Sequence, residues 1–332
     1  MTACFHILNV LLMLTSPVPA AAPSAPKPIT PQTPPTAPEL PTHKKDRPVV
    51  YDAIKYSAAG QGVATRRELA RLNIPTIPMA YHGGVDWNQD GVITESDRRQ
   101  FRKWIDSTIP ANATGPAVMD YEQPWWDELN AKTLDPDTLN EVLAVYLDGL
   151  AEARALRPGL EWGYWGLPTM RNVSKGWADQ GLSIAPLINA SGAVYPSAYD
   201  CNPGDNSDDF GRHVTRVLEA VNGQRPVIVF LSIRFCGQNK DRSKFLPMEE
   251  LLSNANAVLG ATWTAPDGTV HRATGIALWD PYIWSDEADW PALDRLHAET
   301  FSRLSALAEL LRPAQPSSSS PPPRPGPRGD LP

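Results

Sequence analysis

Residues 117–126 read AVMDYEQPWW, an apolar run that leads directly into two acidic residues, Asp120 and Glu122. If the run is a β-strand, residues two apart share a face, so both carboxyl groups lie on one side and Tyr121 lies on the other. Two close carboxyl groups raise the pKa of one of them, which keeps a general acid protonated near neutral pH. This is the chemistry of glycosidic bond cleavage. The same spacing also allows an acidic pair that caps the next loop or binds a cation.

Aromatic residues follow several of the apolar runs, and the chain contains 11 tryptophans. Sugar rings present apolar C–H faces that stack on aromatic planes, so aromatic side chains beside a carboxyl pair favour a carbohydrate cleft. The alternative is that they fill the core or its helical layer, as we expect for Trp104. The tryptophans at expected strand ends are Trp125, Trp126, Trp165, Trp279 and Trp284.

The block 49–312 must position these residues, and in it short apolar runs alternate with helical patterns. That order is typical of a parallel sheet wrapped by helices, and the block is close to the size of a β/α barrel. The clearest helix begins after Asp135, with Pro136 at its first position, and ends at Pro158. The fold class is therefore α/β, a distorted TIM-like barrel with about seven strands, with an open doubly wound sheet as the alternative.

The flanks of this block have a different composition. Residues 1–20 contain a short apolar core followed by small residues, which predicts a signal peptide and a secreted or extracytoplasmic protein. Residues 21–48 form a Pro-rich linker, and residues 313–332 form a Pro/Ser-rich tail that we expect to be disordered. The apolar core is too short to span a membrane.

The net charge is −7 and no cluster of Lys and Arg stands out, which argues against nucleic-acid binding. The expected partner is a polysaccharide, and we expect a monomer.

A second motif, DWNQDGVITESD, predicts a structural calcium ion near the cleft. Its oxygen-bearing side chains follow the spacing of a calcium loop, with a glycine at the sharp turn and a backbone carbonyl after it. A polar loop with an Asx turn is the alternative. No cofactor is expected for catalysis itself. The proposed calcium ligands are Asp86, Asn88, Asp90, the carbonyl of Val92, Thr94 and Asp97, around Gly91.

The chain has three cysteines, and Cys4 belongs to the expected signal peptide. Cys201 and Cys236 remain as one candidate disulfide in an exported chain. The six histidines show no zinc-ligand spacing.

Four segments of the chain resemble the hyaluronidase family of glycoside hydrolases, glycoside hydrolase family 56, in the same order and with similar spacing. They are MDYEQPWW from residue 119, LRPGLEWGYWGLP from 156, AVYPSAYD from 193 and GIALWD from 275. The resemblance covers nearly the whole block and implies a hyaluronidase-like barrel. We expect no counterpart of the cysteine-rich module that follows the barrel in many animal members.

The resemblance implies a retaining, substrate-assisted mechanism. Glu122 would act as general acid and base, while Asp120 would orient the 2-acetamido group whose oxygen attacks the anomeric carbon. Tyr195 would contact the acetamido group, Trp279 would form the floor of the subsite and Tyr164 would line the opposite wall. Further substrate contacts are expected from Trp165, Trp125 and Arg234.

Two departures from the family pattern concern the cleft. The basic residue shortly after the catalytic Glu is absent, and Ser232 stands where the family has a tyrosine. The remaining basic candidates are Arg171, Lys175 and Arg234. We therefore expect a secreted retaining endo-β-N-acetylhexosaminidase of hyaluronidase type. The sequence does not determine which N-acetylhexosamine-containing polysaccharide is its substrate. The alternative is a non-catalytic carbohydrate-binding or surface protein on a degenerate glycosidase barrel.

Overall fold

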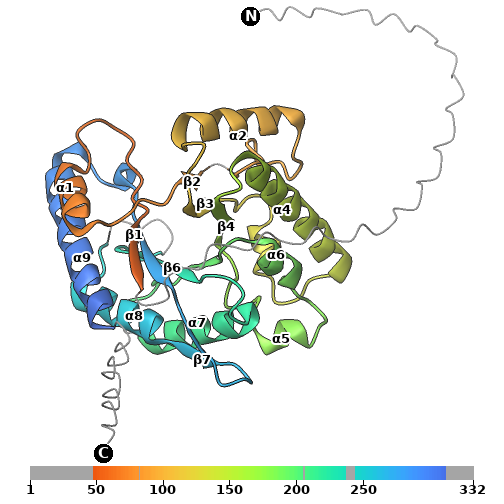
Figure 1. Cartoon of the computed structure of the whole chain (residues 1–332). Coiled ribbons are helices and arrows are strands. Elements are labelled where there is room, and N and C mark those ends of the chain that lie inside the picture. Colours follow the sequence, from red (N-terminus) through yellow and green to blue (C-terminus); the bar gives the residue numbers. More distant parts are fainter. Residues whose placement is uncertain (1–47, 82, 205, 237–243, 312–332) are drawn as a thin grey trace, which may run out of the picture. The chain divides into compact units, whose positions relative to one another are not determined.

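The computed structural model describes residues 48–81, 83–204, 206–236 and 244–311. Figure 1 shows these residues in colour. The expected signal peptide, the tail at 313–332 and all of the Pro-rich linker except Pro48 lie outside the described residues.

Seven parallel strands form the centre of the fold. They hydrogen-bond in two runs, β1-β9-β6 and β2-β3-β4-β5, and every pair within these runs is parallel. The strands are β1 (Val49–Asp52), β2 (Met79–Ala80), β3 (Gly115–Met119), β4 (Leu160–Gly166), β5 (Tyr195–Pro196), β6 (Ile228–Ser232) and β9 (Gly275–Trp279).

Isolated bridges join the two runs at both ends. Asp52 of β1 pairs with Thr76 just before β2, and Ser197 just after β5 pairs with Phe230 of β6, both in parallel. The strands therefore follow one another in a ring, in chain order, without the reversal of order that marks a doubly wound sheet. This confirms the predicted TIM-like barrel of about seven strands.

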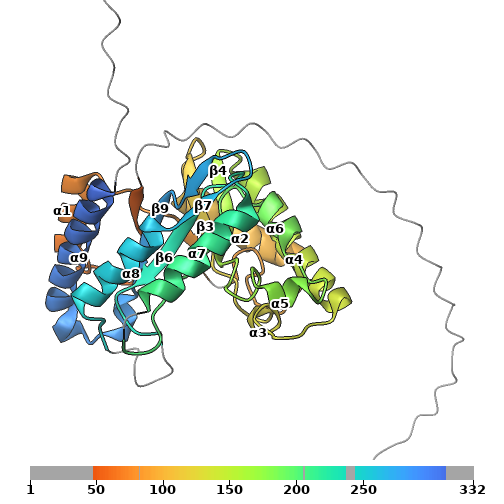
Figure 2. The ribbon, with the colours of Figure 1, turned by 90° about the horizontal axis from the view of Figure 1, so that it is seen from below.

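Helices lie around the ring of strands, as Figures 1 and 2 show. Helix α4 begins as predicted, because the Asp135 side chain accepts a hydrogen bond from the Thr138 N–H and Pro136 occupies the first turn. No helix within the described ranges is long and apolar enough to cross a membrane. The helices are α1 (Val63–Leu72), α2 (Glu95–Thr108), α3 (Trp126–Leu129), α4 (Pro136–Leu156), α5 (Lys175–Ala178), α6 (Ala185–Ala190), α7 (Ser207–Val221), α8 (Met248–Gly260) and α9 (Trp290–Leu310).

Three smaller pieces complete the fold. The hairpin of β7 (Thr262–Thr264) and β8 (Val270–Arg272) packs against α7, and two 3-10 turns, η1 (Tyr282–Trp284) and η2 (Glu287–Asp289), connect β9 to α9.

The apolar side chains separate into two clusters, as the alternation of strand residues requires. One cluster fills the barrel and includes Val118, Tyr195 and Phe230. The other lies between the strands and the helices and includes Ala117 and Met119. Because Val118 of β3 points into the barrel, the residue two positions later, Asp120, follows it toward the interior.

Candidate active site

Asp120 and Glu122 leave the C-terminal end of β3 and line one cavity of 720 Å³. The Asp120 N–H donates to the carbonyl of Ala80 in β2, and its own carbonyl accepts from the Gly83 N–H, so the backbone is held after the strand ends. Asp120 is half-buried, whereas Glu122 is exposed. Tyr121 points the other way, into the cluster between strands and helices. This is the arrangement that the two-residue spacing predicts.

The surroundings of Asp120 favour its neutral form. Burial raises the pKa of its carboxyl group to about 7, the negative charge of Glu122 adds to the increase, and the positive charge of Lys55 opposes it. Lys55 follows β1, and its ammonium group lies 4.0 Å from the ring centre of Tyr81. The carboxyl pair can therefore hold a proton near neutral pH, which a general acid requires. Lys55 is not among the predicted site residues, although its position near the end of an expected strand is a usable signal.

Five aromatic side chains form a continuous wall beside the carboxyl groups. Trp126 stacks on Trp165 with ring centres 5.4 Å apart, and Trp165 lies 5.5 Å from Tyr199. Tyr199 stacks on Trp279 at 5.7 Å, and Trp279 meets Trp284 edge to face at 5.1 Å. All five line the 720 Å³ cavity. They come from the segments after β3 and β5, from β4 and β9 themselves, and from η1.

The tryptophan that faces the cavity after β3 is Trp126, not Trp125 as the sequence suggested. Trp126 fits over Gly166, whose φ is 76° and where an added Cβ would lie 2.6 Å from the indole ring. Trp125 packs against Gly91 on the other side of the segment and does not line the cavity. Trp165 does line it, and its Nε1–H donates to the Tyr199 hydroxyl at 3.2 Å.

Tyr195 does not reach the cavity, which corrects its expected substrate contact. Its side chain is 0% exposed inside the barrel, and its hydroxyl donates to the Glu161 carbonyl at 2.5 Å and accepts from the Ala117 N–H at 3.1 Å. Tyr199 lies four residues further along the chain and contributes its ring to the cavity wall instead. The sequence contained Tyr199 in the same motif, but nothing in it distinguished the depths of the two rings.

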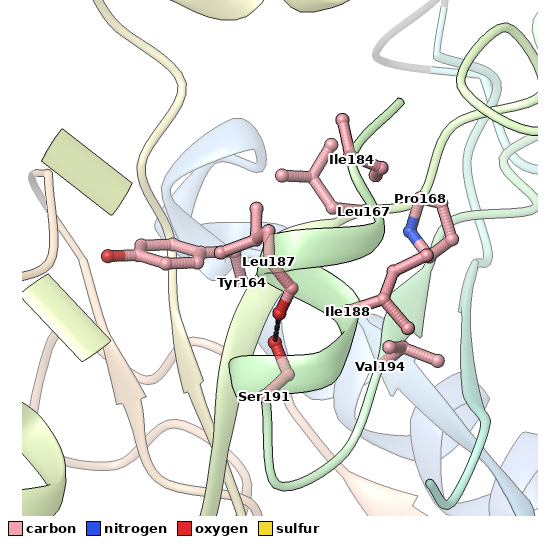
Figure 3. A pocket seen from close by; sticks show the side chains of 8 residues that line it. All are labelled: Tyr164, Leu167, Pro168, Ile184, Leu187, Ile188, Ser191 and Val194. Carbon is pink, nitrogen blue, oxygen red and sulfur yellow. Dashed lines mark hydrogen bonds between the residues drawn. The ribbon is translucent and has the colours of Figure 1, made fainter. Parts of the chain in front are cut away.

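Tyr164 is a second correction, because it lies on the helix side of β4. Its hydroxyl donates to the Tyr146 carbonyl in α4 at 2.8 Å, and its ring packs among Tyr121 and Tyr146. Figure 3 shows it beside Leu187 of α6, in a mostly apolar pocket whose lining includes neither acid of the carboxyl pair. Strand alternation explains this, since its neighbour Trp165 takes the inner face.

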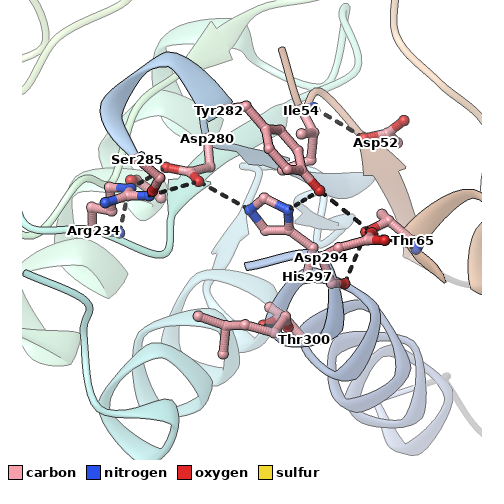
Figure 4. A network of polar contacts seen from close by, with 12 residues as sticks. Asp52, Ile54, Thr65, Arg234, Asp280, Tyr282, Ser285, Asp294, His297 and Thr300 are labelled. Carbon is pink, nitrogen blue, oxygen red and sulfur yellow. Dashed lines mark hydrogen bonds and ion pairs between the residues drawn. The ribbon is translucent and has the colours of Figure 1, made fainter. Parts of the chain in front are cut away.

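Arg234 is the third correction. Its guanidinium is 2% exposed and donates to Asp280 at 2.6 Å and to the Ser285 hydroxyl at 2.8 Å. Asp280 also contacts His297 of α9 at 3.0 Å, so the end of β9 is anchored from two sides (Figure 4). Arg234 lines a separate cavity of 480 Å³ together with Phe245. It therefore supports the segment that carries the cleft aromatics rather than facing a ligand in the cleft.

Few charged groups besides the carboxyl pair line the cavity. Among the described residues that line the cavity, Arg171 is the one with a guanidinium group, and Lys175 does not line the cavity. His213 is buried and contacts the Pro168 carbonyl at 3.3 Å, and burial lowers the pKa of its ring to about 4, so it is neutral at physiological pH. Ser232 lines the cavity at the end of β6. The wall is thus mostly aromatic and uncharged.

The predicted disulfide between Cys201 and Cys236 is present, with Cα atoms 4.5 Å apart. Both cysteines line the cavity, and the bond ties the segment after β5 to the segment after β6.

The candidate calcium loop lies between β2 and α2, next to β3. Asp86 accepts hydrogen bonds from Tyr121 and Gly91, while Asn88 and Asp90 bond to each other. Asp97 forms a capping box with Thr94 at the start of α2. In the described ranges no group of three or more His, Cys, Asp or Glu side chains converges as metal ligands do. The calcium ion stays a prediction.

Comparison with known proteins adds evidence about the fold. No protein-family model matches the chain, and no curated protein sequence matches it significantly. Among solved structures, bee venom hyaluronidase in complex with a hyaluronic acid tetramer matches 78% of this chain and 99% of that chain, with a TM-score of 0.55 and 13% identity. At this identity the similarity shows the fold, a β/α barrel.

Two other solved structures match with lower TM-scores. A monoclinic crystal structure of bee venom hyaluronidase matches 63% of this chain and 77% of that chain, at a TM-score of 0.48 and 15% identity. The spore cortex-lytic enzyme of Bacillus megaterium matches 75% of this chain and 65% of that chain, at a TM-score of 0.37 and 10% identity.

Proposed function

We propose that the protein is a glycoside hydrolase that cleaves an N-acetylhexosamine-containing polysaccharide by a retaining, substrate-assisted mechanism. The observation that carries this proposal is the carboxyl pair Asp120 and Glu122 in one cavity whose wall is a continuous row of aromatic rings. Carboxyl groups provide the proton transfer, and aromatic faces bind sugar rings. The similarity of the barrel to that of bee venom hyaluronidase supports the same class.

Glu122 acts as the general acid and base in this mechanism. It is the more exposed of the two acids, so the leaving glycosidic oxygen and the later water can both reach it. It donates a proton as the bond between the anomeric carbon and the leaving oxygen breaks, and it accepts a proton from water in the second step.

Asp120 orients the nucleophile, which belongs to the substrate. The acetamido oxygen attacks the anomeric carbon and forms a cyclic oxazolinium intermediate, and water then opens the ring with net retention. Asp120 lies deeper than Glu122, where a carboxylate can accept a hydrogen bond from the acetamido N–H. Because burial and Glu122 raise its pKa to about 7, it shares the pair's proton before substrate binds. Tyr199 and Trp279 form the adjacent wall.

The lining favours a substrate of low charge density. Hyaluronan carries a carboxylate on every second sugar, whereas Arg171 is the guanidinium found in the described lining. Polymers of neutral N-acetylhexosamines fit the aromatic wall without further cations. The disulfide and the expected signal peptide support a location outside the cytoplasm.

One observation favours a binding protein without turnover as the second candidate. Ser232 lines the cavity where the resembling family has a tyrosine, so its hydroxyl reaches less far toward a substrate than a tyrosine hydroxyl would. Such a protein would keep the aromatic wall and bind oligosaccharides without cleaving them.

Release of new reducing ends from hyaluronan, chondroitin, chitin oligomers and peptidoglycan distinguishes the two candidates. The proposal predicts release from at least one N-acetylated polymer and none from plain glucans. Binding to these polymers without release would establish the second candidate instead.

A further inference from the structure

We propose that the loop from Asp86 to Asp97 binds one Ca²⁺ ion and that this ion braces the segment carrying Asp120 and Glu122. The proposal is independent of the reaction that the cleft performs. It starts from the sequence DWNQDGVITESD, which places oxygen atoms at alternate positions before a glycine turn and ends with an acid in the first turn of a helix.

The burial and hydrogen bonding of the Asp86 carboxylate are the observations that point to a bound cation. Its side chain is 0% exposed, and one carboxylate oxygen, Oδ2, accepts from the Gly91 N–H at 2.8 Å and from the Tyr121 hydroxyl at 2.6 Å. The other oxygen, Oδ1, is buried without a hydrogen-bond partner. The bond to Gly91, across the turn, directs the carboxylate toward the inside of the loop. A buried carboxylate oxygen needs a partner, and a cation would supply it.

The turn itself has the conformation that a calcium loop needs. Gly91 has a φ of 87°, and an added Cβ there would lie 2.7 Å from the Trp125 ring and 3.2 Å from Pro124, so only glycine fits. Gln89 also has a positive φ, of 58°. Both positive angles fall where the chain turns, and across this turn the Gly91 N–H donates to Asp86 at the start of the loop.

Two of the remaining ligands, Asn88 and Asp90, are at the surface and can turn toward the ion at small cost. Asn88 and Asp90 are exposed and bond to each other at 2.8 Å, and Asp90 also accepts from the Val92 N–H at 2.9 Å. Calcium takes six to eight oxygen ligands in flexible geometry, including backbone carbonyls and water. Asn88, Asp90, the Val92 carbonyl and the buried Asp97, which caps α2 together with Thr94, are the further oxygen atoms that the loop offers to an ion at Asp86.

The loop is connected to the carboxyl pair through two contacts. The Tyr121 hydroxyl donates to Asp86, and Tyr121 lies between Asp120 and Glu122 in the chain. Gly91 packs against Trp125 and Pro124, which follow Glu122. An ion that fixes Asp86 and Gly91 therefore restricts the backbone on both sides of Glu122.

The test is titration of the full chain with CaCl₂ after treatment with chelator, followed by calorimetry and by terbium luminescence excited through the nearby indole rings. We expect one ion per chain with a Kd below about 1 mM, and a rise in Tm of about 5 °C at saturating calcium. Absence of heat, of sensitised terbium emission and of any Tm change at about 10 mM calcium, ten times that Kd, would overturn the proposal.

Matched variants make the test specific to the loop. Asp90→Ala removes an exposed ligand and is expected to weaken calcium binding at least about tenfold, because fewer charged ligands remain. Glu95→Gln removes an exposed acid of the same segment that is not a ligand, so binding should stay within about twofold. Equal calcium affinity in Asp90→Ala and the unmodified chain would contradict the site. Asp86→Asn is a poorer first test, since the buried side chain also holds Gly91 and Tyr121.

Discussion

At the scale of single residues, the two acids differ because their surroundings differ. Asp120 is half-buried beside the barrel interior, and Glu122 is exposed at the cavity mouth. Burial and the nearby negative charge raise the pKa of Asp120 to about 7. Before substrate binds, the pair's proton is therefore favoured on Asp120, whereas Glu122 is the group that substrate and water reach. In the proposed mechanism Glu122 carries the proton when Asp120 accepts a hydrogen bond from the acetamido N–H.

The raised pKa of Asp120 predicts how stability depends on pH. Between the usual pKa of 3.8 and about 7, the folded protein holds a proton that the unfolded chain has lost. The free energy of unfolding therefore falls as pH rises through this window. Asp120→Asn does not titrate, so it should be about 2 kcal/mol more stable than the unmodified protein above pH 7, after allowance for solvent screening, and nearly equal to it below about pH 4. Denaturant unfolding at both pH values measures this, and an equal difference at both would contradict the assignment.

The aromatic wall predicts a binding role for Trp279, which stacks on Tyr199. Trp279→Ala should weaken oligosaccharide binding by about tenfold or more, because a stacking face for a sugar ring is lost. Trp104→Ala is the control, since Trp104 stacks on Phe101 of α2 in the helix layer. Binding isotherms should separate the two variants, and equal losses in both would indicate a general effect on folding.

At the scale of elements, strand alternation decides which predictions succeed. It correctly places Asp120 and Glu122 on the opposite face from Tyr121, because polar and apolar residues contrast there. It fails between Tyr164 and Trp165, where two adjacent aromatic residues give no contrast. It also fails for Trp125 and Trp126, which lie beyond the strand, where the conformation of the loop and not the alternation sets the direction.

The sequence also does not show how deep in the barrel a side chain lies. Tyr195 and Tyr199 belong to one motif, but one ring is buried in the barrel and the other lines the cavity. Arg234 shows a related failure. Its position after β6 suggested a ligand contact, and only the folded structure brings it against Asp280, which directly follows β9. The prediction of the disulfide succeeded because the sequence contains few cysteines that could pair.

The anchoring of β9 leads to a prediction about stability. Asp280 is 0% exposed and contacts both Arg234 and His297, so its charge neutralises a guanidinium that is 2% exposed. Asp280→Asn removes that charge and should lower the free energy of unfolding by about 3 to 5 kcal/mol. Glu287→Gln, an exposed acid of η2, should change it by less than about 0.5 kcal/mol. Denaturant unfolding tests both, and a loss below 1 kcal/mol in Asp280→Asn would contradict the anchoring role.

At the scale of the whole molecule, the barrel gathers side chains from distant parts of the sequence at the C-terminal ends of its strands. The carboxyl pair, the five aromatic rings and the disulfide all meet there. This is the end at which β/α barrels place their active sites. The number of strands and the helical layer were predicted from short apolar runs that alternate with helical patterns. The order of the aromatic side chains along the wall depends instead on how the strands close into a barrel.

The most direct test of the proposed function compares the unmodified protein with Glu122→Gln on N-acetylated polymers, with reducing ends and bound oligosaccharide measured in parallel. Glutamine keeps the size and hydrogen bonding of Glu122 but cannot transfer its proton. The proposal predicts that turnover falls by about a hundredfold to ten-thousandfold while oligosaccharide binding is retained. Full activity in Glu122→Gln, or cleavage of plain glucans as readily as N-acetylated chains by the unmodified protein, would contradict it.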